Sequence, residues 1–411
     1  VHLVFDMPDR TMNVFSNAAI HELGAFAAWL KGADVRGVVV RSGKTNAFCA
    51  GADLGELGQA YDMIIAARQQ DRFNVAFEHF FPLSRAIRAL ETAGKPVAIA
   101  IAGLALGGGC ELALGGHYRV LVDDPRVALG LPESLVGLLP GAGGTQRLPR
   151  LIGVKAALPI LLDGGRLSGA DALASKLVHE LVAPGDEIAA AERWILSADD
   201  AGQPWDEPRF APASHEEIAP IITAARSRVL QEGRGHYPAP LAILDCIEQG
   251  FVQPFDAAIR TEMSIFSYLI QRPEPRNMIQ TLFLGKTDYE RAARKDGVPA
   301  AVAQAVFVIG RSISKVGDAS DALRAAGFGG MAGAPVQARA WPGYWIDHAD
   351  DQLAVDARAR IETILTVAAS YVHSLSPQER RIADYALVKD YGFPAYLGGP
   401  LSLSVALQQQ Q

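Results

Sequence analysis

The stretch LGGGCELALGG, residues 106–116, places three consecutive glycines before a carboxylate in an otherwise apolar segment. A glycine inside a helix costs about 1 kcal/mol relative to alanine, and a buried carboxylate without partners costs more. A glycine at a strand-to-helix turn does, however, let a backbone N–H approach a ligand oxygen, because no side chain blocks it. The stretch therefore predicts a turn that faces a ligand, with Glu111 just inside the following helix.

A second carboxylate, Glu133, lies in the apolar segment LGLPESLVGLLPGAGGTQRLPR, residues 129–150. Apolar surroundings raise the pKa of a carboxyl group, and two neighbouring carboxyl groups resist double ionisation. One then keeps its proton while the other loses it, which supplies an acid and a base at neutral pH. A single Glu in an apolar helix is more often a paired structural group, but the glycine turn and the second motif together favour a catalytic pair of Glu111 and Glu133.

A third segment, NAFCAGADLGEL, residues 46–57, places small residues before Asp53, a natural cap for a new helix. The start of a helix favours negative charge because its backbone N–H groups are unpaired. One N–H from this turn and one from the glycine-rich turn would form an oxyanion hole, which stabilises a carbonyl that becomes an enolate.

Strand and helix patterns alternate over the first 196 residues and predict an α/β domain. Apolar runs predict strands in VHLVFD, VRGVVVRSG, KPVAIAIAG, YRVLVDD and RVALGLPE, and a helix in SNAAIHELGAFAAWL with Ser16 as its cap. Residues 197–214 are rich in Pro, Asp and Ala and predict a linker. Helical patterns dominate after it, apart from an irregular stretch expected at 325–345.

Charge and cysteine content exclude several classes of protein. The formal net charge of −7 argues against non-specific nucleic-acid binding. Cys49, Cys110 and Cys246 are odd in number and far apart, which predicts no disulfide framework and a reducing compartment. We expect Cys49 and Cys110 to be small buried residues, no metal site, and no membrane span. The start VHLVFDMPDR lacks the features of a signal peptide, so a cytoplasmic location is expected.

The motifs FCAGADL, ALGGGCELAL, LGLPE and LLPGAGGTQRLPRLIG, in this order, resemble the crotonase (enoyl-CoA hydratase/isomerase) superfamily. More narrowly, residues 1 to about 285 are similar to the N-terminal hydratase domain of bacterial fatty-acid-oxidation multifunctional enzymes. The resemblance implies a crotonase fold of repeated β-β-α units over residues 1–196. It further implies a linker over 197–214, helices over 215–290 that pack on this domain, and a small, mostly α-helical C-terminal region over 291–411.

The same resemblance implies roles for individual residues. The N–H groups of Ala52 and Gly108 would bind the thioester oxygen of an acyl-CoA, Glu111 would activate a water, and Glu133 would exchange a proton with C2. Gly55 departs from the pattern, because single-domain hydratases often have a CoA-binding Lys there. The residues expected to line the substrate site are Met12, Ala50, Asp53, Leu54, Gly107, Pro132 and Gly141.

The function implied is hydration of a trans-2-enoyl-CoA to a 3-hydroxyacyl-CoA, in fatty-acid β-oxidation or related acyl-CoA catabolism. Two alternatives stay open: Δ3-Δ2-enoyl-CoA isomerisation by the same glutamates, and a non-catalytic acyl-CoA-binding subunit. The implied substrate is a coenzyme A thioester, with no metal or redox cofactor. A homo-oligomer, or a thiolase or dehydrogenase partner, is expected. The segment MSIFSYLI, residues 263–270, is either helix core or part of an acyl tunnel.

The second half lacks a convincing dinucleotide-binding motif. Its nearest match to G-x-G-x-x-G is GFGGMA at 327–332, which follows a helical pattern instead of a strand. Pro335 and Pro342 discourage the helix that should come next. The segment IADYALVKDYGFPAYLGGPLS, residues 382–402, nevertheless resembles the end of a 3-hydroxyacyl-CoA dehydrogenase. We therefore expect a multifunctional enzyme whose NAD-binding dehydrogenase domain is missing, and no dehydrogenase activity.

Overall fold

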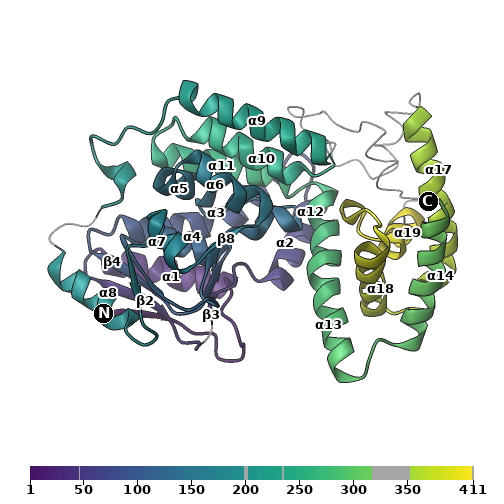
Figure 1. The fold of residues 1–411 in the computed structure, drawn as a ribbon, viewed down its shortest axis with the longest axis horizontal. Coiled ribbons are helices and arrows are strands. Elements are labelled where there is room, and N and C mark those ends of the chain that lie inside the picture. The colour runs from purple at the N-terminus through teal and green to yellow at the C-terminus, as the bar shows by residue number, and fades with distance from the viewer. Residues whose placement is uncertain (46, 199–201, 234–235, 317–351, 410–411) are drawn as a thin grey trace. The chain divides into compact units, whose positions relative to one another are not determined.

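The structure, a computed structural model, describes residues 1–45, 47–198, 202–233, 236–316 and 352–409 (Figure 1). The chain folds into two compact units. Unit 1 comprises Val1–Arg226 and Ala242–Leu269, and unit 2 comprises Ser227–Leu241 and Ile270–Gln411. The stretch expected to be irregular at 325–345, with its GFGGMA motif, lies outside the described residues.

Unit 1 is built on a five-stranded parallel sheet in the order β1-β2-β4-β6-β9. Every residue of β4 is buried, which explains why its sequence is a continuous apolar run without alternation. Helix α8 (Glu187–Ser197) packs its buried alanines on β2, β4 and β6. The strands are His2–Phe5 (β1), Val38–Ser42 (β2), Val97–Ile101 (β4), Tyr118–Val122 (β6) and Glu180–Val182 (β9).

A second sheet of very short strands accompanies the first. It has the order β3-β5-β7-β8, with β3, β5 and β7 parallel and β8 antiparallel at the edge. Each of β3, β5 and β7 directly follows a strand of the first sheet and precedes a helix, so the chain repeats a β-β-α unit. The predicted crotonase-type α/β class is therefore confirmed. The strands are Ala47–Cys49 (β3), Leu104–Leu106 (β5), Leu129–Gly130 (β7) and Arg166–Leu167 (β8).

Helices surround these sheets in unit 1 (Figure 1). The predicted cap of the first helix is present, because Ser16 Oγ accepts a hydrogen bond from Ala19 N. Helix α3 packs against α1, α2 and α11. Helices His215–Gly233 (α9) and Pro238–Gly250 (α10) each cross a boundary between the two units. The remaining helices of unit 1 are Asn17–Leu30 (α1), Leu54–Ala66 (α2), Arg72–Glu91 (α3), Gly108–Leu114 (α4), Gly144–Ile152 (α5), Val154–Asp163 (α6), Gly169–Ala174 (α7) and Phe255–Leu269 (α11).

The segment predicted as a linker, 197–214, contains one short 3-10 helix, Pro204–Asp206 (η2), in its described part. The Trp205 ring stacks on Phe255 with 4.6 Å between ring centroids and an interplanar angle of 13°. Asp206 accepts two hydrogen bonds from the Arg88 guanidinium. This segment is therefore anchored to unit 1 through α3 and α11, although it has little regular structure.

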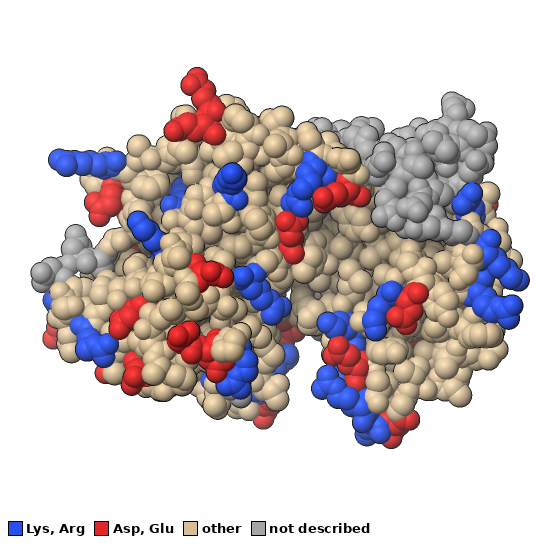
Figure 2. Space-filling model, in the orientation of Figure 1, with Lys and Arg blue, Asp and Glu red and all other residues tan. Residues whose placement is uncertain are grey.

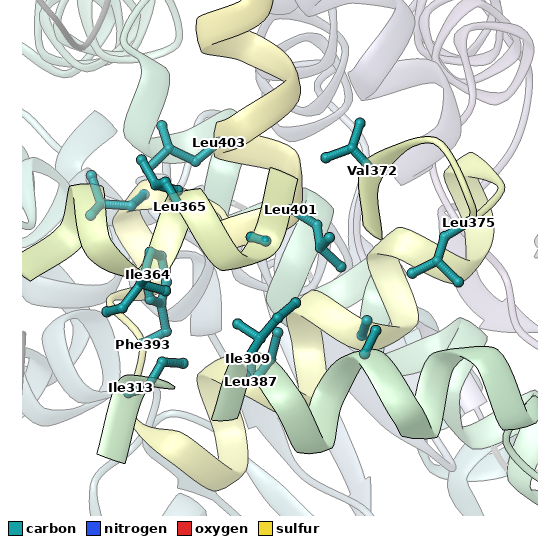
Figure 3. Close-up of a cluster of buried hydrophobic side chains, with 14 of the residues drawn as sticks. Ile309, Ile313, Ile364, Leu365, Val372, Leu375, Leu387, Phe393, Leu401 and Leu403 are labelled. Carbon is teal, nitrogen blue, oxygen red and sulfur yellow. The ribbon is translucent and has the colours of Figure 1, made fainter. Parts of the chain in front are cut away.

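Unit 2 is helical in its described part, as the sequence predicts. Its core gathers apolar side chains from α14, α17, α18 and α19, including Ile309, Ile364, Leu387 and Leu401 (Figure 3). The helices are Pro273–Met278 (α12), Ile279–Gly285 (η3, a π-helix), Lys286–Lys295 (α13), Ala300–Val316 (α14), Gln352–Val372 (α17), Pro377–Tyr391 (α18), Ala395–Leu397 (η4, a 3-10 helix) and Pro400–Gln408 (α19).

The compact units divide the chain after Leu269, within the stretch 215–290 that was predicted to be helical. The packing of these helices on the first domain stays a prediction. Within unit 2, helices α12 and η3 pack on η4 and α18, and Thr281 Oγ1 donates a hydrogen bond to the carbonyl oxygen of Gly398. Local helical periodicity does not specify which core a helix joins.

Asp384 ties α18 to the start of α19 in unit 2. Its buried carboxylate accepts hydrogen bonds from Leu401 N (2.8 Å), Ser402 N (2.9 Å) and Ser402 Oγ (2.6 Å). A buried donor left without a partner costs about 1–3 kcal/mol. We therefore expect Asp384→Ala to destabilise this helix pair by about 2 kcal/mol or more.

Hydrogen exchange of the α19 amides measures this loss directly, as faster exchange in peptides that cover residues 400–408. Asp390→Ala is the matched control, because Asp390 lies on the same helix with its side chain about half exposed. Equal exchange in the two variants would contradict a capping role for Asp384.

The described surface mixes charges of both signs. Figure 2 shows Lys and Arg side chains standing among Asp and Glu side chains on the visible face of each unit. No helix in the described ranges combines the length and hydropathy that a bilayer span requires.

Candidate active site

The three turns singled out in the sequence follow the carboxyl ends of β3, β5 and β7. Residues 50–53 follow β3, Gly107 and Gly108 follow β5, and residues 131–133 follow β7. These strands are neighbours and parallel, so their carboxyl ends meet at one edge of the second sheet. Ligands of open α/β folds bind at such an edge. The structure therefore brings the three motifs together.

The turn between β5 and α4 depends on glycine at two positions. Gly107 has φ 55° and ψ −130°, a conformation that other residues rarely adopt. A Cβ on Gly107 would lie 2.9 Å from Glu133 Oε1, and one on Gly109 would overlap the carbonyl oxygen of Cys49. The glycines thus allow the turn to contact both the second carboxylate and the end of β3.

Glu111 lies on α4 with only 2% of its surface exposed. Its Oε1 accepts hydrogen bonds from Ala142 N (2.6 Å) and Gly144 N (2.8 Å), and its Oε2 accepts none within the described part of the chain. Burial raises the pKa of Glu111 to about 7, against the opposing effect of these two bonds and of the Arg147 charge. A carboxyl group that titrates near neutrality with one unused oxygen is suited to accept a proton from a bound water.

Glu133 lies on the 3-10 helix η1 (Pro132–Val136) that follows β7. The residue is only partly buried, but its Oε2 atom is enclosed and has no hydrogen-bond partner among the described residues. Burial of the carboxyl group, then the charges of Glu111 and Glu262, raise the pKa of Glu133 well above the usual range. The raised pKa favours the protonated form of Glu133, which is suited to donate a proton.

The backbone N–H groups of Ala52 and Gly108 come from two turns in contact. A Cβ on Gly51 would lie 3.5 Å from Gly108 N. Phe15 pairs with the first turn through hydrogen bonds to Gly51 O and from Asp53 N, which turns the Ala52 N–H to the opposite side. Neither predicted donor bonds to a protein acceptor within the described residues, as an oxyanion hole requires.

Asp53, one of the residues predicted to line the substrate site, has hydrogen-bond and ion-pair partners within the protein. Asp53 caps α2 by accepting from Gly55 N (2.9 Å), and it forms an ion pair with Arg10 Nη2 (2.6 Å). Its carboxylate therefore has a structural task. Gly55 is an exposed residue, and its N–H group donates to the Asp53 carboxylate in this cap.

Two of the remaining predicted residues lie beside Glu133, and a third lies against α11. Gly107 contacts Glu133, and Pro132 immediately precedes Glu133. Gly141 lies against Phe266 and Met263, at 3.2 Å and 3.7 Å from the position of its missing Cβ. The segment 263–270 thus contributes buried side chains beside the predicted site as well as helix core.

The last three predicted residues belong to the N-terminal side of the site. Ala50 and Leu54 flank the Ala52 turn and are partly buried. Met12 precedes Asn13, whose carbonyl oxygen accepts a hydrogen bond from Ala50 N (2.9 Å). The described contacts place Met12 near this turn and give no contact between Met12 and either carboxyl group.

Sequence reasoning missed a third buried carboxylate, Glu262 on α11. It is fully buried, and it accepts hydrogen bonds from Gly143 N (2.6 Å), Thr145 N (2.9 Å) and Thr145 Oγ1 (2.5 Å). Burial and then the charge of Glu111 raise the pKa of Glu262 to about 8. A Glu at an apolar position of the α11 pattern was the available signal.

Arg147 packs against the glycine-rich turn at residues 141–144 and donates a hydrogen bond to it. Its guanidinium forms an ion pair with Glu91, at 2.9 Å and 3.1 Å, and donates to the carbonyl oxygen of Ala142 at 2.8 Å. Gly143 has φ 97°, and a Cβ there would overlap Arg147 Nη1. Gly143 and Gly144 of GAGGTQR therefore allow close packing against charged groups, Arg147 and Glu111 respectively.

The cysteines beside the motifs are buried and unpaired. Burial raises the pKa of Cys49 to about 12 and also raises that of Cys110. Both thiols stay neutral at physiological pH, which does not favour a nucleophilic role.

Comparison with known proteins gives this geometry a context. Residues 3–199 match the family model described as "Enoyl-CoA hydratase/isomerase". The chain is 32% identical over 322 residues to the fatty acid oxidation complex subunit alpha of Shewanella frigidimarina, which covers 77% of this chain and 44% of that protein. The corresponding subunit of Shewanella amazonensis is 33% identical over 318 residues, covering 75% and 43%. The chain therefore spans less than half the length of these curated relatives.

Among solved structures, the enoyl-CoA hydratase of Rhodobacter sphaeroides 2.4.1 is 21% identical and superposes with a TM-score of 0.53, covering 70% of this chain and 87% of that one. This likeness shows the fold. Together with the family match and the homology to the alpha subunits, it leads to one conclusion: the first half of this chain is a domain of the enoyl-CoA hydratase/isomerase (crotonase) family.

Proposed function

We propose that unit 1 is an enoyl-CoA hydratase that adds water to a trans-2-enoyl-CoA to give a 3-hydroxyacyl-CoA. The observation that carries the proposal is the pair of carboxyl groups whose pKa values burial raises, Glu111 and Glu133, beside two unpaired backbone N–H groups on touching turns. Acid and base groups held in one enclosed site are what an addition across a double bond requires.

In the proposed reaction, the N–H groups of Ala52 and Gly108 bind the thioester oxygen. Glu111 Oε2 holds a water and accepts its proton while the water oxygen forms a bond to C3. The C2–C3 double bond opens to an enolate, whose negative charge lies on the thioester oxygen in the oxyanion hole. Glu133 then gives its proton to C2, and transfer of a proton from Glu111 to Glu133 resets the site. The proposed reaction uses these groups alone, with the coenzyme A thioester as substrate.

Loss of the conjugated-thioester absorbance of crotonyl-CoA, on addition of the full chain, tests the proposal. We expect turnover, with 3-hydroxybutyryl-CoA as the product identified by mass spectrometry. Longer trans-2-enoyl-CoAs extend the test to other chain lengths. Tight binding of acyl-CoA without turnover of any of them would contradict the proposal and favour a non-catalytic binding subunit. Conversion of 3-enoyl-CoA without hydration would favour an isomerase.

The assembly and location are proposals as well. The curated relatives are named as subunits of a fatty acid oxidation complex, so we propose that this chain acts in acyl-CoA catabolism as a homo-oligomer or beside a thiolase or dehydrogenase partner. The three unpaired cysteines support a reducing compartment such as the cytoplasm. Sedimentation of the purified chain, alone and with candidate partners, tests the assembly.

A further inference from the structure

The turn at residues 142–145 is held between two buried carboxylates on different helices. Its four successive N–H groups alternate between them: those of Ala142 and Gly144 donate to Glu111, and those of Gly143 and Thr145 donate to Glu262. All of these donor residues are buried. The position of each carboxylate therefore constrains the position of the other through a single stretch of backbone.

Glu262 is the more extensively bonded of the two. Both of its oxygens accept hydrogen bonds, and Thr145 Oγ1 adds a third bond to the two from the backbone. Without this carboxylate, the N–H groups of Gly143 and Thr145 would be buried without an acceptor, which costs about 1–3 kcal/mol each. The turn would then shift, and the two N–H groups that orient Glu111 would shift with it.

Other ionisable groups lie near Glu262, and their charges affect its pKa. Glu111 is the like-charged group that acts on it most strongly, and Glu262 in turn raises the pKa of Glu133. The Arg147 charge is balanced by Glu91 in an ion pair. The ionisable groups that interact with Glu262 are Glu111 on α4, Glu133 on η1, Arg150 on α5 and Cys246 on α10. Arg147 on α5 acts on Glu111 and pairs with Glu91 on α3.

We propose that Glu262 is a positioning residue for the reaction at Glu111: it fixes the buried turn at residues 142–145, whose N–H groups orient Glu111. This inference rests on the proposed function for its catalytic meaning. The physical coupling of Glu262, the turn and Glu111 is independent of which reaction the site performs.

Backbone amide NMR tests the coupling without any assay of turnover. The amide shifts of Ala142 and Gly144 report ionisation of Glu111, and those of Gly143 and Thr145 report ionisation of Glu262, because each N–H donates to that carboxylate. In Glu262→Gln, one amide oxygen replaces the two carboxylate oxygens that accept from Gly143 N and Thr145 N, so the turn shifts and its bonds to Glu111 weaken. Because those bonds lower the pKa of Glu111, the titration midpoint seen at Ala142 and Gly144 is expected to rise by roughly half a pH unit. An unchanged midpoint would overturn the proposal.

Two further variants keep the test independent of folding defects. Thr145→Val removes the hydroxyl donor and leaves both backbone bonds to the Glu262 carboxylate in place. The turn keeps these two bonds, so the Glu111 midpoint is expected to rise by less than in Glu262→Gln. Ser267→Ala is the matched control, because Ser267 is buried on the same helix and bonds to Met263 O away from the turn. A shift in Ser267→Ala equal to that in Glu262→Gln would show a general effect of disturbing α11 and would overturn the proposal.

Kinetics then connect the coupling to the reaction. In Glu262→Gln, we expect kcat for crotonyl-CoA to fall with KM changed less than twofold, and the acidic limb of the pH profile to move to higher pH, because the weakened bonds from the turn raise the pKa of Glu111. Failure of the wild-type chain to convert crotonyl-CoA would count against the proposed function, while the NMR result would still decide the role of Glu262. Wild-type turnover with an unmoved acidic limb in Glu262→Gln would count against the positioning role alone.

Discussion

Glu111→Gln and Glu133→Gln are each expected to lower kcat for crotonyl-CoA hydration by about 100- to 10,000-fold, the usual contribution of a general acid or base. The substitutions preserve shape. In Glu111→Gln, the amide oxygen can take the place of Oε1, which accepts both backbone bonds, and the NH₂ group the place of Oε2. The fold and the binding of substrate should therefore survive while proton transfer is lost.

The absorbance assay and a binding measurement with a saturated acyl-CoA separate these effects. Glu248→Gln is a suitable control, because Glu248 is a partly exposed carboxylate on α10 that pairs with Arg226. Full activity in either active-site variant would remove that carboxylate from the mechanism. A Glu111→Gln variant that still isomerises 3-enoyl-CoA would show that Glu133 alone moves protons along the acyl chain.

The free energy of unfolding of the chain is expected to fall as pH rises from 6.5 to 9. Burial raises the pKa of Glu111 to about 7 and that of Glu262 to about 8, both above the ordinary value of 4.5. The folded state therefore binds more protons than the unfolded state over this range, and stability declines with pH. Each group contributes up to about 1.4 kcal/mol per pH unit until its folded pKa is passed.

Opposing groups act only at the lower end of that range. Burial lowers the pKa of His179 to about 4 and also lowers those of His117 and His79, so these side chains add stability as pH rises through 6.5 and contribute little slope above about pH 7.5. Urea unfolding at pH 6.5, 7.5 and 8.5 measures the decline. Glu262→Gln should flatten the slope, since it removes one of the groups. A stability that stays constant or rises over this range would contradict the assigned ionisation.

The parts of the site that lie close in sequence were the parts that sequence could predict. Gly107 and Glu111 belong to one stretch whose cost in helix stability called for an explanation, and Glu133 shares the apolar setting of Glu111. Glu262 could not be found in this way, because its partner Gly143 is 119 residues away in the chain. Only tertiary packing of α11 on α3 and α5 brings them together.

The fold shows the same limit. Strands such as β4 were predictable because burial on both faces requires a continuous apolar run. The three-residue strands β3 and β5 have no period long enough to detect, although their motifs were found. Helix α3 contains Pro82 and was not predicted, and it is stabilised by its packing against α1 and α11. The division between units followed from side chains such as Thr281, whose partner lies more than a hundred residues later.

The stack of Trp205 on Phe255 indicates how far along the chain the first folded domain extends. The family match ends at residue 199. The stack and the Arg88–Asp206 ion pair nevertheless hold the chain that follows residue 199 against unit 1, to which α11 also belongs. A protein truncated at residue 199 would lose Glu262, and the buried N–H groups of Gly143 and Thr145 would then have no hydrogen-bond acceptor. The smallest fragment expected to fold on its own is therefore determined by these buried hydrogen bonds. It extends to the end of α11, about seventy residues beyond the end of the family match.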